Sequence, residues 1–350
     1  MSKFTRRFFL RAGAGAATVA TGQLILPKFV NAQSKQINLY SSRHYNTDNQ
    51  LYGLFTKKTG IKINLIEGKA DELIERIKSE GNNSPADILI SVDAGRLWRA
   101  EQANLFAPVD SSTLTSKIPA NLRHPNNLWF GFSKRARVIV YNKNSVDPSQ
   151  LSSYEDLAAS QWQGKLIIRS SSNIYNQSLV AGLIDVHGEE KVETWCRGLV
   201  NNFARSPQGN DTGQIEAVAS GLADLTVVNT YYLPRYLKNR NPRKQAIFKQ
   251  VGVFFPNQSD RGSHVNISGA GLVKSSPNRE GAIAFLEYLA SPEAQGFFSQ
   301  GNNEYPVVAG TPIDPVVESF GSFKEDTTNV SAYGVNNAKA VQIMDRAGWK

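Results

Sequence analysis

The chain has 350 residues, of which 41% are hydrophobic and 20% charged, which excludes a disordered, collagen-like or coiled-coil protein and allows two domains with separate cores. The only cysteine, Cys196, excludes an intramolecular disulfide and every cysteine-cluster metal site, and four histidines are too few for a histidine-rich one. The first 32 residues carry five basic residues and no acidic one, more than half of the net charge of +9, so the remainder does not suggest nucleic acid as a partner.

The N-terminal segment has the features of an export signal. Residues 5–11 read TRRFFLR and resemble the twin-arginine signal, and the apolar stretch 12–26 is too short to span a bilayer comfortably. Small residues up to Ala32 offer a cleavage site. We therefore predict a twin-arginine signal peptide over 1–32, cleaved near Ala32, export by the twin-arginine translocase and a periplasmic location. The alternative is an uncleaved membrane anchor.

Strands and helices alternate in the next part of the chain. The apolar pattern predicts strands over 37–40, 61–66 and 87–92, and helices over 49–57, 70–79 and 94–102. Asp93 precedes the last helix as its expected N-cap. Alternation in this order predicts a mostly parallel sheet with helices on both faces.

The same alternation restarts after residue 142. Two strand-like runs, over 129–132 and 136–141, precede this point. The pattern then predicts helical segments over 154–159, 174–187, 189–202, 215–220 and 280–290, and strands over 166–168, 225–228, 250–255 and 269–273. Two α/β units in an exported chain suggest a two-lobed, hinged binding protein. We expect the chain to cross between the lobes at 135–141 and 251–256, with a ligand between the lobes at strand ends.

Tyrosines follow short strands in three polar loops. The loops lie within the strings 40–45 (YSSRHY), 169–176 (RSSSNIYN) and 229–232 (NTYY). The carboxyl ends of strands are where the lobes of such a fold face each other. The sequence therefore places several phenol groups near a cleft, although a single tyrosine in a loop usually serves packing.

These strings, together with PADI at 85–88 and WQGKL at 162–166, resemble the periplasmic ferric iron-binding proteins of ABC iron importers, Fut type. The resemblance covers the chain from about residue 36 to the C-terminus. It implies iron ligands at His44, Tyr45, Tyr175, Tyr231 and Tyr232, all of which are occupied by the matching residue. Some relatives add a glutamate and a bound anion, and this chain has no clear match for that glutamate.

The resemblance also implies a fold and a set of partners. The fold would be α/β, with the two transferrin-like lobes and hinge strands of a type II periplasmic binding protein. We predict an N-terminal lobe over 33–135 plus 256–305 and a C-terminal lobe over 136–255 plus 306–350. The expected partner is the membrane permease of an ABC iron importer, and we expect a monomer without an organic cofactor.

The chemistry of iron supports this ligand set independently. Fe³⁺ is a hard cation that prefers anionic oxygen, and a phenol, with a pKa of about 10, must lose its proton to provide it. Four phenolates exceed the charge of Fe³⁺ by one, so nearby arginines would compensate the surplus. We expect Arg135 and Arg235 in this role, and less so Arg43, because neighbours on an extended chain point apart.

Two other functions compete with this interpretation. A binding protein of the same fold could hold an organic or anionic ligand between tyrosine walls. An iron-dependent oxidase is the second alternative, although the sequence has no GxSxG, HExxH or Walker motif and we expect no enzyme. Binding of Fe²⁺ in addition to Fe³⁺ stays open.

Overall fold

The computed structural model describes residues 36–350 except residues 44 and 46. The predicted signal peptide and its cleavage site lie outside the described residues, and so does the predicted ligand His44. Within the described part, no helix is long and apolar enough to span a membrane.

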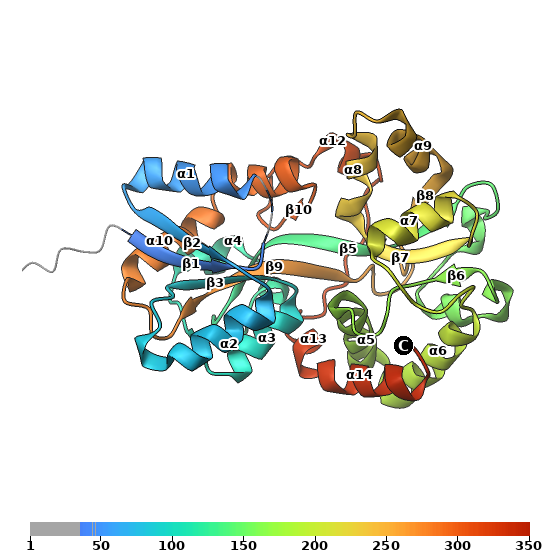
Figure 1. Cartoon of the computed structure of the whole chain (residues 1–350), viewed down its shortest axis with the longest axis horizontal. Helices are drawn as coiled ribbons and strands as arrows, with labels where there is room; N and C mark the ends of the chain where they lie inside the picture. Colours follow the sequence, from blue (N-terminus) through green and yellow to red (C-terminus); the bar gives the residue numbers. More distant parts are fainter. Residues whose placement is uncertain (1–35, 44, 46) are drawn as a thin grey trace, which may run out of the picture. The chain divides into compact units, whose positions relative to one another are not determined.

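The first lobe, at the left of Figure 1, is built on a parallel three-stranded unit. Its strands and helices match the predicted alternation, because each helix buries one apolar stripe against the sheet: Leu73, Ile74 and Ile77 are the buried residues of the α2 stripe. The elements are β1 (Gln36–Ser41), α1 (Asp48–Thr59), β2 (Lys62–Glu67), α2 (Ala70–Glu80), β3 (Ile88–Val92) and α3 (Ala94–Gln102).

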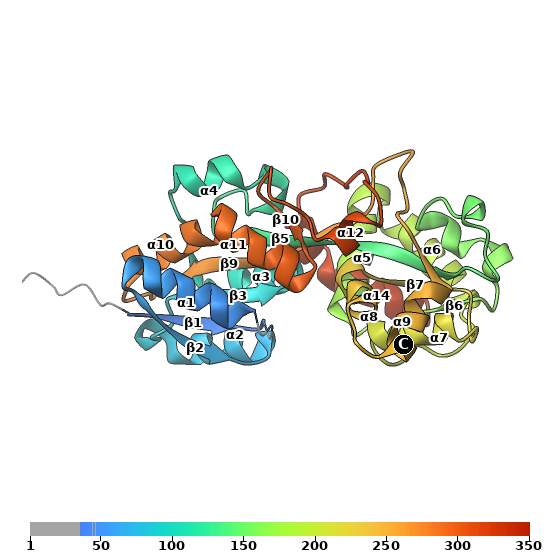
Figure 2. The same cartoon turned by 90° about the horizontal axis from the view of Figure 1, so that it is seen from above.

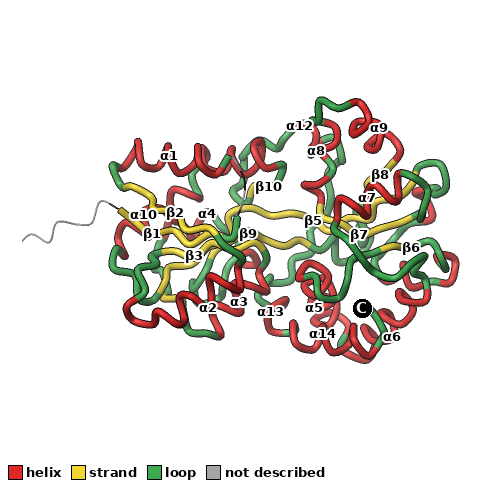
Figure 3. The backbone as a smooth tube through the Cα atoms, viewed as in Figure 1, coloured by secondary structure: helices red, strands yellow, loops and turns green. Residues whose placement is uncertain are grey.

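The second lobe, at the right of Figure 1, repeats this arrangement around a short parallel pair. Its strands are β6 (Leu166–Ile167), β7 (Leu225–Asn229) and β8 (Val251–Phe254). Its helices are α5 (Ile174–His187), α6 (Glu189–Asn201), α7 (Asp211–Ala219), α8 (Pro234–Leu237) and α9 (Pro242–Gln250), with the 3₁₀ turns η4 (Glu155–Ala158) and η6 (Thr230–Tyr232). Figure 3 shows helices around the strands of both lobes.

One long strand joins the lobes. The two runs predicted over 129–132 and 136–141 are wrong as separate strands, because they form a single strand, β5 (Phe130–Asn142). Its first half pairs with β9 (Val265–Val273), and its second half, from Arg137 on, pairs with β7. The expected crossing near 135–141 is therefore confirmed, and Figure 2 shows β5 running from one lobe into the other.

The chain returns to the first lobe differently from our expectation. β8 pairs only with the second half of β5, so 251–256 is not a crossing strand. The return follows in the segment 255–264, which leads into β9. The residue boundaries predicted for the two lobes stay a prediction.

The predicted mostly parallel sheet is also wrong. Three strand pairs of the described chain are parallel (β1–β2, β1–β3 and β6–β7), whereas β5 and β9 run antiparallel to every strand they pair with. The order across the sheet is β2-β1-β3-β9-β5-β7-β6. The two antiparallel strands lie in the centre because they connect the lobes.

The remaining elements cover the lobes and complete the core. They are β4 (Phe106–Ala107), α4 (Ser112–Lys117), α10 (Arg279–Leu289), α11 (Pro292–Gly296), β10 (Tyr305–Pro306), α12 (Pro315–Glu318), α13 (Ala332–Val335) and α14 (Asn337–Arg346). A π-helical turn, Phe297–Gly301, leads to β10, and short 3₁₀ turns occupy Gly81–Asn83, Ala120–Leu122, Pro148–Gln150 and Ser160–Trp162. Trp129 and Trp349 are among the largest fully buried side chains.

Candidate metal centre

Three tyrosines of the second lobe lie together at the ends of its elements. β7, buried along its whole length, ends at Asn229, and the turn η6 that follows carries Tyr231 and Tyr232. Tyr175 lies in the first turn of α5. The Oη atoms of Tyr231 and Tyr175 are 3.3 Å apart, and the ring centres of Tyr231 and Tyr232 are 4.3 Å apart.

Tyr45 from the first lobe joins this group. It lies in the loop after β1, and its ring centre is 5.9 Å from Cζ of Arg235. The same guanidinium lies 5.2 Å from the ring of Tyr231 and 5.3 Å from that of Tyr232. The structure thus brings the four described tyrosines of the predicted set into one cluster, whereas His44 lies outside the described residues.

The cluster favours neutral phenols as long as no cation is present. Burial raises the pKa of Tyr231 well above its usual value, and the phenols of Tyr175, Tyr45 and Tyr232 raise it further. Burial also raises the pKa of Tyr45 and Tyr232, with Glu304 and Asp211 as the largest charges acting in the same direction. A ligand cation must therefore displace protons from these groups.

Three buried or half-buried arginines surround the ring of Tyr175. Cζ lies 5.6 Å from the ring centre for Arg135, and 5.9 Å for both Arg137 and Arg169. We did not predict Arg137 and Arg169. Arg137 could have been predicted, because it follows Arg135 by two residues and residues i and i+2 of a strand lie on the same side.

Two of these arginines are held by one carboxylate. Arg137 Nη1 donates to Oδ1 of Asp211 at 3.0 Å, and its Nη2 donates to Oδ1 of Asn176 at 2.6 Å. Arg169 forms an ion pair with the other oxygen of Asp211. Asp211 is fully buried at the start of α7, so it fixes both guanidinium groups beside the tyrosines.

Arg135 is less completely paired. Its nearest carboxylate oxygen, Oδ2 of Asp93, is 3.8 Å from Nη2, and its Nη1 donates to Ser268 Oγ at 3.4 Å. Nε and Nη2 have no hydrogen-bond partner among the described residues, although the residue is only 2% exposed. A buried cation with unused donors is suited to compensate an anion nearby.

Arg43 has a different environment. Its Nε lies 3.0 Å from Oδ2 of Asp48 and its Nη2 3.3 Å from Oε2 of Glu304, and all three side chains are buried. Its Cζ lies 4.7 Å from the ring centre of Tyr45, two residues along the chain. Glu304, which we did not predict, has no sequence signal, because its partners are brought to it only by the fold.

The described residues near the tyrosines supply five guanidinium groups and four carboxylates, which leaves one positive charge. The cations are Arg43, Arg135, Arg137, Arg169 and Arg235, and the anions are Asp48, Asp93, Asp211 and Glu304. In residues 36–43, 45 and 47–350, histidine, cysteine and carboxylate side chains form no group of three that could hold a metal ion. Among the described residues, the phenol groups are therefore the candidate anionic ligands of a metal centre here.

Comparison with known proteins identifies the family. The family model described as bacterial extracellular solute-binding protein matches residues 83–324, more than half of the chain. The chain belongs to this family. This membership confirms that the protein is a solute-binding protein and not an enzyme.

Relatives within the solute-binding family carry iron in their names. The chain is 57% identical over 360 residues to Iron uptake protein A1 of Synechocystis sp., with 100% of both chains covered. It is 52% identical to Iron uptake protein A2 of the same organism, covering 100% of this chain and 99% of the relative. These matches confirm the resemblance to Fut-type proteins.

Solved structures agree with the fold. One described as Trichodesmium IdiA (FutA) in complex with iron and citrate ligands has a TM-score of 0.88 and 66% identity, and covers 90% of this chain and 100% of that one. The ferric binding protein from Campylobacter jejuni has a TM-score of 0.84 and 41% identity, with 90% and 100% covered. The predicted two-lobed periplasmic-binding-protein fold is confirmed.

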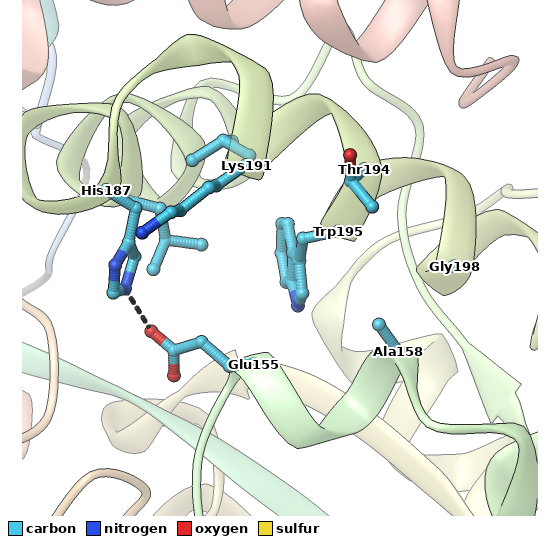
Figure 4. Close-up of a pocket in the computed structure, with 9 residues that line it drawn as sticks. Glu155, Ala158, His187, Lys191, Thr194, Trp195 and Gly198 are labelled. Atoms are coloured by element: carbon cyan, nitrogen blue, oxygen red, sulfur yellow. Dashed lines mark hydrogen bonds and ion pairs between the residues drawn. The ribbon is translucent and has the colours of Figure 1, made fainter.

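A separate cavity of this solute-binding protein contains none of the predicted site residues. It has a volume of about 400 Å³ and lies between η4, α5 and α6, as Figure 4 shows. His187 Nε2 lies 2.7 Å from Oε1 of Glu155 at its side. Although burial opposes it, hydrogen bonds from Asn257 and Arg261 lower the pKa of Glu155 to about 2. The Glu155 carboxylate at the side of this cavity is therefore already paired.

Proposed function

We propose that this protein binds Fe³⁺ between its two lobes through the phenolate oxygens of Tyr45, Tyr175, Tyr231 and Tyr232, together with His44. The observation that carries the proposal is the convergence of four tyrosines from three separate segments, with the Oη atoms of Tyr175 and Tyr231 3.3 Å apart. The names of the two Synechocystis relatives and the iron in the FutA structure support iron as the solute.

The charges around the tyrosines support a trivalent cation. Four phenolates and Fe³⁺ carry a net charge of −1, and the surrounding arginines and carboxylates carry +1. The loaded site is therefore close to neutral, which limits the cost of burying it. A divalent cation with the same four phenolates would leave a net negative charge, so Fe²⁺ would fit only with one phenol protonated.

The three arginines we predicted differ in their proposed roles. Arg135 and Arg235 compensate the phenolate charge, because neither is neutralised by a close carboxylate: Asp93 is 3.8 Å from Arg135. The charge of Arg43 is already balanced by two carboxylates. We therefore assign Arg43 chiefly to holding the loop of Tyr45.

The proposed physiological role is capture and delivery of iron. The family and a 29% identical relative, the Fe(3+)-binding periplasmic protein of Serratia marcescens, support a periplasmic location, and we propose a partnership with the permease of an ABC transporter. We further propose export by the twin-arginine route with cleavage near Ala32, a monomeric state, and lobes of 33–135 plus 256–305 and 136–255 plus 306–350.

Loading the mature protein with ferric citrate tests the proposal. We expect about one iron per chain by elemental analysis and an absorption band in the visible from phenolate-to-iron charge transfer. A colourless, iron-free protein would contradict the proposal and would favour the organic or anionic ligand that the tyrosine walls also fit.

A further inference from the structure

A strained and fully buried carboxylate lies between the two lobes. Asp93, the N-cap of α3, has φ +96° and ψ 125° and is 0% exposed. A residue other than glycine adopts positive φ at a cost, and such strain concentrates at functional sites. Capping α3 does not require it, because the other N-caps whose side chains accept a bond in this protein have negative φ, as at Ser111 and Asn210.

The carboxylate of Asp93 is contacted from four elements. Oδ1 accepts hydrogen bonds from the backbone N–H of Gly95 in α3 at 2.9 Å and from Ser178 Oγ in α5 at 2.7 Å. Oδ2 accepts from Asn266 Nδ2 in β9 at 3.0 Å and lies 3.8 Å from Nη2 of Arg135 in β5. We call Asp93, Gly95, Arg135, Ser178 and Asn266 the Asp93 cluster.

Two members of the cluster lead directly to the tyrosines. Ser178 follows Tyr175 by three residues in the first turns of α5, so the two lie on neighbouring positions of one helix. Arg135 has its Cζ 5.6 Å from the ring centre of Tyr175. Figure 1 shows α3 and α5 on the same side of β5, where α13 contacts both.

We propose that Asp93 is a positioning residue for the iron site: it joins α5 of the second lobe to the first lobe through Ser178, and it directs Arg135 toward Tyr175. The inference rests on the proposed function and deepens it. Asp93 contacts no predicted ligand itself, and it acts on the helix that carries one.

Within the Asp93 cluster, the hydrogen bond from Ser178 to Asp93 connects the second lobe to the first lobe. This connection does not involve the metal. A hydrogen bond to a buried carboxylate is stronger than one between neutral groups. If the lobes close on iron, this bond stabilises the closed form. Its loss should accelerate iron release by about tenfold.

Ser178→Ala removes this hydroxyl and leaves the charge of the site unchanged. Ser276→Ala is the matched control, because Ser276 Oγ donates at 2.6 Å to Asp87, a buried aspartate of the same lobe. We would load each variant with ferric citrate and measure release to EDTA by the decay of the visible band. We expect full loading of both variants and about tenfold faster release from Ser178→Ala alone.

Asp93→Asn tests the second half of the proposal. Asparagine tolerates positive φ and can still accept from Gly95 and Ser178, but its amide presents donors to Arg135 and Asn266. We expect a shift of the visible band as Arg135 moves relative to Tyr175. A merely structural role would lower the melting temperature and leave the band in place.

The outcomes separate the two levels of the argument. A wild-type protein without iron overturns the proposed function. A loaded wild type, with equal release rates from Ser178→Ala and Ser276→Ala, overturns the lobe-joining role. An unshifted band in Asp93→Asn overturns the direction of Arg135. If Ser178→Ala fails to fold by circular dichroism, Ser178→Cys, which keeps the size of the side chain and replaces the hydroxyl by a weak donor, decides: a wild-type release rate contradicts the lobe-joining role.

Discussion

Two arginines at almost the same distance from the tyrosines should contribute very differently to iron binding. Arg135 lies 5.6 Å from the ring centre of Tyr175 and is 2% exposed, whereas Arg235 lies 5.2 Å from that of Tyr231 and is exposed to solvent. With an effective dielectric constant of about 20, a unit charge at the first distance contributes about 3 kcal/mol, or roughly a hundredfold in affinity. In a water-like dielectric of about 80, the second contributes about 0.8 kcal/mol, or roughly fourfold.

The test compares Arg135→Gln with Arg235→Gln. Glutamine retains hydrogen-bonding groups and removes the charge, and Asp93 keeps its other hydrogen bonds when Arg135 is replaced. We would measure ferric ion affinity by competition with citrate at two salt concentrations, with thermal unfolding as the control for folding. Arg135→Gln should lose about a hundredfold, independent of salt, and Arg235→Gln should lose only a few fold, less at high salt.

The pH of iron release provides a second readout of the same variants. Without Arg135 the phenolates are less stabilised, so their protons return at higher pH and iron should leave at higher pH. Equal losses in the two variants, or a larger loss in Arg235→Gln, would refute the argument that burial decides the contribution.

Further predictions follow from the tyrosines and the N-terminus. Tyr231→Phe should strongly weaken iron retention in a competition with a chelator. Tyr141→Phe should match the wild type, because the ring of Tyr141 packs on Gly252 of β8. Equal iron affinities of the two variants would mean that the ligands are misassigned. Burial raises the pKa of Tyr45 and Tyr231 above the unfolded value of about 10, so the metal-free protein should lose stability as the pH rises beyond about 10. Denaturant titrations at pH 8 and pH 11 measure this loss. An unchanged unfolding midpoint would contradict the prediction. Replacing Arg6 and Arg7 together by Lys should leave uncleaved precursor in the cell, as an immunoblot of cell fractions would show, and normal export would favour another route.

The helices of the first lobe could be predicted from sequence because they bury one face. Leu73, Ile74 and Ile77 in α2 recur at helical spacing, and Asp93 precedes α3 with a side chain that accepts from the N–H of Gly95 in the first turn. Local patterns of this kind depend on neighbours in the chain. Such patterns can therefore be recognised in the sequence without knowledge of the fold.

The long strand β5 was predicted in two pieces for a physical reason. Ser133, Lys134 and Arg135 interrupt its apolar pattern at the place where the strand leaves the core of one lobe and enters the other. Arg135 lies beside the ring of Tyr175, whereas Lys134, on the other side of the strand, forms an ion pair with Glu325. Strand direction is not encoded in periodicity either, so the antiparallel connection by β5 and β9 could not be read from the sequence.

The candidate site also has a part that could be predicted from the sequence and a part that could not. The tyrosines could be named because each follows a strand within a polar loop and because the strings resemble a family. Their charged surroundings could not: Asp211 is 74 residues from Arg137, and Glu304 is 261 residues from Arg43. These carboxylates form their ion pairs only when folding places a guanidinium group beside them. A sequence pattern therefore cannot distinguish them from acidic residues on the surface.

The protonation state of the tyrosines connects binding with release. Without a bound cation, burial and neighbouring phenols keep Tyr45, Tyr231 and Tyr232 protonated, and the arginines and carboxylates around them leave one positive charge. Under the proposed function, Fe³⁺ exchanges for the phenol protons, and the loaded site becomes neutral. Acid reverses this exchange, and reduction to Fe²⁺ leaves an uncompensated negative charge that favours reprotonation. Burial therefore has two effects. It strengthens the attraction between the phenolates and Fe³⁺ in the loaded site. It also raises the pKa of each phenolate from which the metal has dissociated, so protonation then becomes favourable and the iron is released.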